Sequence, residues 1–202
     1  MRRCAAGRSI AANPIRFCIS AATQSASKPI AKRSRDGSRV AACIWWHIAD
    51  TAPAPANPAK RRWLALFDET QRLHPGQGIA VIGRSLGSGI ASQLAAQRPV
   101  AQLALITPFD SMVATAKAHY PVFPVGWLLD ERYESDKALK TFEAPVLIVH
   151  AGLDEVVPEA NTVRLIAALS KPPTTVRIAN ADHNDISAHP EFESALSEFL
   201  SH

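Results

Sequence analysis

The chain has 202 residues and an apolar fraction of 47%, which suits one globular domain with a hydrophobic core. Its formal net charge is +4, unevenly spread: residues 1–62 hold 12 basic and 2 acidic side chains, and residues 63–202 hold 10 and 16. No apolar run is long enough to span a membrane, and the basic residues are scattered without an aromatic platform, which argues against a membrane-spanning or nucleic-acid-binding protein.

Residues 1–62, here called the head, differ in composition from the remainder. All three cysteines lie here, and their odd number and irregular spacing predict neither a disulfide framework nor a zinc site. A reducing compartment, the cytoplasm, is therefore the expected location. Residues 40–48 are the only predicted strand of the head, and residues 51–58 are typical of a Pro/Ala linker.

Three interpretations of the head stay open. Its Arg-rich, Ser-rich and acid-poor composition is typical of a transit peptide, which would imply an organelle. A basic tail for an acidic surface is the second interpretation. We favour the third, that the head is poorly ordered or is not part of the fold, so that the domain covers residues 63–202.

Beyond the head, helices and strands alternate. The predicted helices cover residues 63–73, 87–97, 159–169 and 190–201. The predicted strands cover residues 78–82, 101–106, 144–150 and 174–178. Such alternation predicts a mainly parallel sheet in a three-layer α/β sandwich. Residues 109–142 are irregular and aromatic, and we expect them to form a cap over the sheet edge.

The turn from Gly83 to Gly87 is the most informative motif, because it joins a buried strand to a helix around Ser85. Glycine at both flanks removes Cβ atoms that would collide at a tight corner. A serine at such a turn, called a nucleophile elbow, projects its hydroxyl at the positive end of the following helix.

Asp154 and His183 also follow predicted strands, and the carboxyl ends of parallel strands meet at one edge of the sheet. A serine hydroxyl needs an imidazole to remove its proton, and a carboxylate fixes the tautomer of that imidazole. Asp182 and Asp185 flank His183 and compete for the role of the acid. We favour Asp154, since a separate loop orients an imidazole better than an adjacent residue.

The sequence resembles the alpha/beta-hydrolase family, in particular its small bacterial serine hydrolases and serine aminopeptidase-like members. The resemblance rests on residues 83–89, 107–112 and 150–158 and on the loop that carries His183, and it covers about residues 63–202. It implies Ser85 as nucleophile, Asp154 as acid and His183 as base. It also implies that the backbone N–H of Leu86 is one of two oxyanion donors.

The chain departs from that family in its first third. Members usually build about eight strands, whereas four are predicted here, so the resemblance covers only the C-terminal half of the fold. The second oxyanion N–H usually follows an earlier strand, yet the only head glycines, Gly7 and Gly37, follow no predicted strand. Without N-terminal strands, the strand at 78–82 is expected to present an unpaired apolar edge.

The cap suggests an apolar substrate. We expect five of its side chains to contact the substrate: Phe109, Met112, Phe123, Trp127 and Leu128. The sequence therefore predicts hydrolysis of a small ester or thioester through an acyl-enzyme, with no cofactor and no metal. Packing of the cap against the domain is an equally good interpretation of each side chain.

Two other classes of function stay open. Without the N-terminal half, the chain is alternatively an inactive fragment or an interaction module. More remotely, the spacing of Gly83, Gly87 and Gly89 matches a short-chain dehydrogenase, and Tyr133 and Lys137 match the catalytic pair of that family. These two residues follow the glycines too closely, with too few strands between them.

Overall fold

The computed structural model describes residues 15–20, 46–47, 58–121, 123 and 132–201. A six-stranded sheet with the order β2-β1-β3-β4-β5-β6 forms its centre, and all neighbouring strands run parallel. The strands are β1 (Ile15–Ser20), β2 (Trp46–His47), β3 (Ile79–Arg84), β4 (Val100–Ile106), β5 (Val146–Ala151) and β6 (Thr174–Ile178). The three-layer parallel α/β class expected from the sequence is confirmed.

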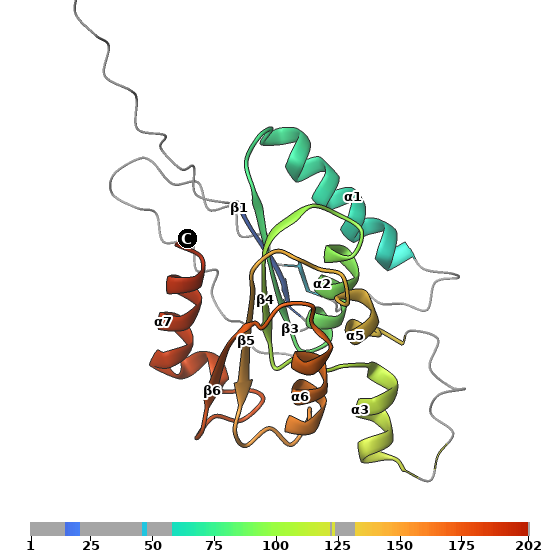
Figure 1. Cartoon of the computed structure of the whole chain (residues 1–202), viewed down its shortest axis with the longest axis vertical. Coiled ribbons are helices and arrows are strands. Elements are labelled where there is room, and N and C mark those ends of the chain that lie inside the picture. The colour runs from blue at the N-terminus through green and yellow to red at the C-terminus, as the bar shows by residue number, and fades with distance from the viewer. Residues whose placement is uncertain (1–14, 21–45, 48–57, 122, 124–131, 202) are drawn as a thin grey trace, which may run out of the picture.

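Helices cover both faces of the sheet, as Figure 1 shows, with α7 on the opposite side from α1, α2 and α6. The helices are α1 (Pro58–Leu73), α2 (Leu86–Ala95), α3 (Met112–His119), α5 (Ser135–Ala138), α6 (Glu159–Ala168), the 3-10 turn η2 (Ile186–Ala188) and α7 (Pro190–Phe199). Ser111 caps α3, because its hydroxyl accepts the N–H of Ala114 at 3.1 Å. Pro190 begins α7, where its missing N–H costs no hydrogen bond.

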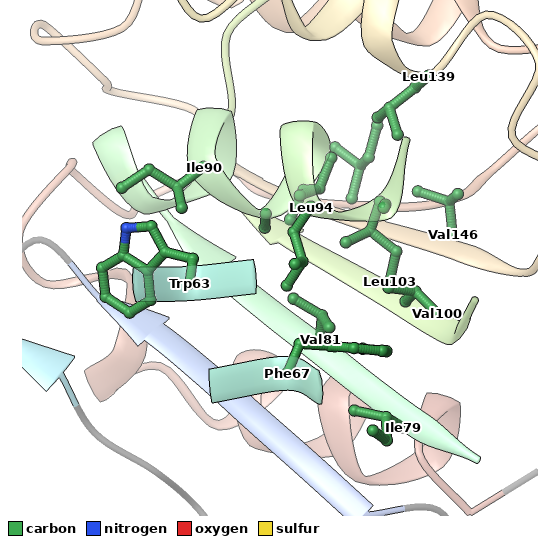
Figure 2. Close-up of a cluster of buried hydrophobic side chains, with 14 of the residues drawn as sticks. Trp63, Phe67, Ile79, Val81, Ile90, Leu94, Val100, Leu103, Leu139 and Val146 are labelled. Carbon is green, nitrogen blue, oxygen red and sulfur yellow. The ribbon is translucent and has the colours of Figure 1, made fainter. Parts of the chain in front are cut away.

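The larger core lies between the sheet and the layer of α1, α2, α5 and α6. Trp63 and Phe67 extend from α1 toward the strand side chains, and Ile90 and Leu94 of α2 pack beside them (Figure 2). Small residues bring α2 close to the sheet: a Cβ at Gly83 would lie 2.5 Å from the carbonyl oxygen of Gly87. This close packing fixes the start of α2 directly above the end of β3.

The second core lies between the other face of the sheet and α7. Ala80 and Ile82 of β3 point to this face, as do alternate residues of β4 and β5. Phe192 and Leu196 of α7 pack against them. Gln102 on β4 also joins the two layers, because its side-chain N–H donates to the carbonyl of Phe199 at 2.9 Å.

The head contributes to the sheet, contrary to our expectation. β1 pairs with β3 over six residues, from Ile15 beside Ile79 to Ser20 beside Arg84, so the expected unpaired edge of β3 is wrong. The sequence 15–20 alternates apolar and polar or small residues, a short strand pattern that the neighbouring Pro14 obscures. Of the expected strand at 40–48, only Trp46 and His47 are described, and they form β2.

The expected start of the first helix is also corrected. α1 begins at Pro58, so the predicted boundary between residues 62 and 63 falls inside this helix. Proline favours the first position of a helix as readily as a linker, and the basic residues 60–62 continue the helix. The remaining head residues, 1–14, 21–45 and 48–57, lie outside the described residues.

Candidate active site

The turn around Ser85 has the geometry expected of a strained strand-to-helix corner. Ser85 lies at φ 52° and ψ −123°, a backbone conformation that non-glycine residues rarely adopt. Its N–H donates to the carbonyl of Ile106 on β4 at 2.9 Å, and its carbonyl accepts the N–H and hydroxyl of Ser88 at 2.8 and 2.6 Å. Leu86 follows as the first residue of α2, where backbone N–H groups have no partner within the helix.

Asp154 lies in the loop between β5 and α6, with its side chain only 4% exposed. Its Oδ1 accepts the backbone N–H groups of Val156 at 2.9 Å and Val157 at 2.7 Å. These two bonds fix the carboxylate in one orientation. Its Oδ2 is therefore directed at the loop that follows β6.

His183 lies in that loop and connects the serine with the carboxylate. Its Nδ1 lies 2.8 Å from Asp154 Oδ2 and 3.0 Å from Oδ1, and its Nε2 lies 2.9 Å from Ser85 Oγ. An ionised carboxylate only accepts hydrogen bonds, so Nδ1 carries the hydrogen and Nε2 is free to accept from the serine hydroxyl. The structure thus brings three residues from three strand ends into one hydrogen-bonded chain.

The two competing carboxylates bond to the backbone of the His183 loop. Asp182 Oδ1 accepts the N–H groups of Asn184 at 2.6 Å and Asp185 at 2.9 Å, and these bonds lower the pKa of Asp182. Asp185 Oδ1 in turn accepts the N–H of Asp182 at 2.7 Å. Both side chains stabilise the loop that carries His183.

Two residues near the hydrogen-bonded series of Ser85, His183 and Asp154 were not predicted from the sequence as functional candidates. Arg84, beside Ser85, donates from Nη2 to the carbonyls of His183 and Asn184, both at 2.9 Å. His150 on β5 is 7% exposed, and burial lowers its pKa, although the nearby Glu159 carboxylate opposes that shift. The alternation of side chains along β3 is the sequence signal that could have drawn attention to Arg84. For His150, the signal is a polar residue near the end of an otherwise apolar strand.

The structure separates the expected substrate-contacting residues of the cap. Phe109 is 2% exposed and lies against α2, where a Cβ at Gly89 would approach its ring to 2.9 Å, so it packs the core. Met112 is half-buried at the start of α3. Phe123 is 58% exposed and meets the Tyr120 ring edge to face. Trp127 and Leu128 lie outside the described residues.

The dehydrogenase-like pair does not form a shared site in the described structure. Lys137 directs its ammonium to Glu134 Oε1 at 2.8 Å on the surface of α5. The side chain of Tyr133 packs against the larger core. The described residues hold no group of three His, Cys, Asp or Glu side chains placed for a metal. Within the same ranges, no helix has the length and apolarity needed to cross a bilayer.

Relatives in sequence cover the chain only in part. A 137-residue stretch, 65% of this chain, is 40% identical to 49% of an uncharacterized protein of Mycobacterium tuberculosis. Another, 62% of the chain, is 26% identical to 37% of an alpha/beta hydrolase domain-containing protein of Caenorhabditis elegans. The chain spans about half the length, or less, of the curated relatives it matches. No protein-family model matches it.

Solved structures match more of the chain. The esterase domain of a Rhodothermus marinus protein matches 95% of this chain and 86% of its own length, with a TM-score of 0.62 and 20% identity. A meta-cleavage product hydrolase of Pseudomonas fluorescens matches 74% of each chain, with a TM-score of 0.54 and 17% identity.

Parallel α/β sandwiches that carry a serine at the tight turn after a central strand form one structural class. In this class the functional site lies at the edge of the sheet where the strands have their carboxyl ends. The fold is that of the alpha/beta hydrolases, and the resemblance expected from the sequence is confirmed at this level.

Proposed function

We propose that this chain is a serine hydrolase that cleaves small acyl esters through an acyl-enzyme. The hydrogen-bonded chain from Ser85 through His183 to Asp154 carries the proposal. The alpha/beta-hydrolase fold supports it, since several proteins of similar fold are esterases or lipases by name.

In the proposed reaction, Ser85 Oγ attacks the ester carbonyl while its proton passes to His183 Nε2. The resulting imidazolium donates that proton to the departing alkoxide, which leaves the acyl group on Oγ. A water then loses a proton to Nε2 and attacks the acyl carbon, and Oγ takes the proton back. Asp154 keeps the hydrogen on Nδ1 and stabilises the imidazolium throughout.

The N–H of Leu86 is the proposed oxyanion donor on this side of the substrate. It lies in the first turn of α2, where the helix dipole adds a positive potential. The second donor of alpha/beta hydrolases follows the strand beside the nucleophile strand. Here that strand is β1, and its last residue, Ser20, is level with Arg84, so the expected segment begins at residue 21, outside the described residues.

The half-buried Met112 and exposed Phe123 near the start and middle of the cap favour an apolar acyl group. We therefore propose ester or thioester substrates before peptides. Phe109 does not take part in this proposal, because it is buried in the packing beneath α2.

A fluorophosphonate probe tests the nucleophile directly, since it reacts only with an activated serine. Wild type and Ser170→Ala, an exposed serine after α6 whose hydroxyl bonds the carbonyl of Phe142, should label equally. Ser85→Ala should not label, and it should lose hydrolysis of 4-nitrophenyl esters from acetyl to octanoyl. A folded wild type that neither labels nor hydrolyses any of these esters would instead support an inactive interaction module.

A further inference from the structure

Arg84 occupies a position that links the serine turn to the histidine loop. It is the last residue of β3, directly before Ser85. Side chains alternate along a strand, and Ala80 and Ile82 point to the face covered by α7. Arg84 follows them on that face, where the loop after β6 also lies.

Its guanidinium joins two segments that are far apart in sequence. Nη2 donates to the carbonyl oxygens of His183 and Asn184, both at 2.9 Å, across 99 and 100 positions of the chain. Burial lowers the pKa of Arg84, while the carboxylates of Asp154 and Asp182 oppose this shift. An arginine side chain keeps its charge in such surroundings, so both bonds have a cationic donor.

The loop that carries His183 also has hydrogen bonds of its own, from its backbone N–H groups to two of its carboxylates. Asp182 accepts the N–H groups of Asn184 and Asp185, and Asp185 accepts the N–H of Asp182. These contacts shape the loop but do not attach it to the sheet. The bonds from Arg84 attach the loop to the end of β3, directly before Ser85.

We propose that Arg84 is a positioning residue, which holds the carbonyls of His183 and Asn184 and so keeps His183 Nε2 at hydrogen-bonding distance from Ser85 Oγ. This inference rests on the proposed function, since it concerns how the base reaches the nucleophile. Because Arg84 and Ser85 are adjacent, any displacement of the turn moves the nucleophile and the attachment of the base together. A shift of about 1 Å between reacting groups can cost about 100-fold in rate.

Arg84→Met tests this by keeping a long apolar stem while removing both donors. We expect its rate of fluorophosphonate labelling to fall by about 10- to 100-fold. Arg84→Lys keeps one cationic donor on a shorter stem and should recover part of that loss. Arg98→Met is the matched control, because Arg98 pairs with Asp68 on the surface; it should label like wild type.

A second background separates positioning from a general effect on the turn. Residues that act as a unit have non-additive effects. Arg84→Met should therefore cause no further loss when added to His183→Ala. An equal loss on both backgrounds, or labelling of Arg84→Met at the wild-type rate, would overturn the proposal.

Hydrogen exchange tests the contact without any need for activity. In Arg84→Met, peptides covering residues 180–189 should exchange faster than in wild type, while peptides covering α6 should not change. Unchanged exchange at 180–189 in the folded variant would refute the attachment. A wild type that does not label would refute the proposed hydrolase alone, and the exchange result would still decide the role of Arg84.

Discussion

Replacement of Asp154 by asparagine gives the sharpest test of how the carboxylate acts. Two backbone N–H groups, from Val156 and Val157, donate to Oδ1, so only an oxygen fits at that position. Asparagine therefore keeps its carbonyl oxygen there and places its amide nitrogen where Oδ2 was, 2.8 Å from His183 Nδ1. A donor then faces a donor.

The imidazole relieves that conflict by moving its hydrogen to Nε2, so that Nδ1 accepts from the amide. Nε2 then has no lone pair for the proton of Ser85, although every heavy atom stays in place. In a serine protease with the same three groups, this change of tautomer lowers kcat by about 10⁴. At about 1.36 kcal/mol per factor of ten, that corresponds to about 5.4 kcal/mol of lost transition-state stabilisation.

Asp154→Ala separates the two roles of the carboxylate, which are to accept backbone N–H groups and to hold the tautomer of His183. It leaves the N–H of Val157, a residue 4% exposed, without its acceptor, which costs about 1–3 kcal/mol of stability. Asparagine keeps that acceptor and should cost less than about 1 kcal/mol. We expect Asp154→Asn to unfold at the same temperature as wild type but to lose labelling. We expect Asp154→Ala to unfold at a lower temperature and also to lose labelling.

The assay combines the fluorophosphonate labelling rate with thermal unfolding of the same preparations. Asparagine should label at least as slowly as alanine, because alanine leaves the tautomer of His183 unforced. Labelling of Asp154→Asn within tenfold of wild type would refute the argument from the tautomer.

Three further predictions concern stability. Gly83→Ala should destabilise the fold by about 3 kcal/mol in urea unfolding, because its Cβ would meet backbone and side-chain atoms of α2 at 2.5 to 2.8 Å; an unchanged midpoint would contradict this contact. Asp110→Ala should lower the free energy of unfolding by about 2–3 kcal/mol, since buried Asn161 and the Arg164 guanidinium both donate to Asp110. Asp68→Ala, which removes an exposed ion pair with Arg98, should lower it by under about 1 kcal/mol. Equal losses in the two variants would contradict the argument. The lowered pKa of His150 means that the unfolded chain binds more protons near its usual pKa of about 6.5, so the free energy of unfolding should fall as the pH drops through this range. His150→Gln should reduce this pH slope, and an unchanged slope would contradict the argument.

The candidate site could be predicted from the sequence because the relevant signals are local. Ser85, Asp154 and His183 each follow a predicted strand, and parallel strands place their carboxyl ends at one edge whatever their register. The choice of Asp154 over Asp182 also followed from geometry, since an adjacent carboxylate cannot easily face the imidazole beside it.

The features that escaped prediction depend on distant contacts. Six residues, 15–20, form a strand only because β3 offers a partner far along the chain, and their short pattern was indistinct beside Pro14. The role of Arg84 could not be predicted from the sequence, because its two carbonyl partners, His183 and Asn184, lie about 100 positions away. The sequence left two interpretations of Phe109, packing and substrate contact, because aromatic character does not distinguish them; the structure buries this side chain.

The pairing of β1 with β3 also bears on the order in which the sheet assembles. Ile15 pairs with Ile79, 64 positions further along, whereas Ile79 pairs with Val100 only 21 positions away. Loop closure costs more entropy for longer loops, so β3, α2 and β4 can associate before β1 finds its place. During synthesis β1 leaves the ribosome before β3, its partner in the sheet. The edge of β3 that β1 covers therefore stays open to intermolecular pairing until a late step of folding.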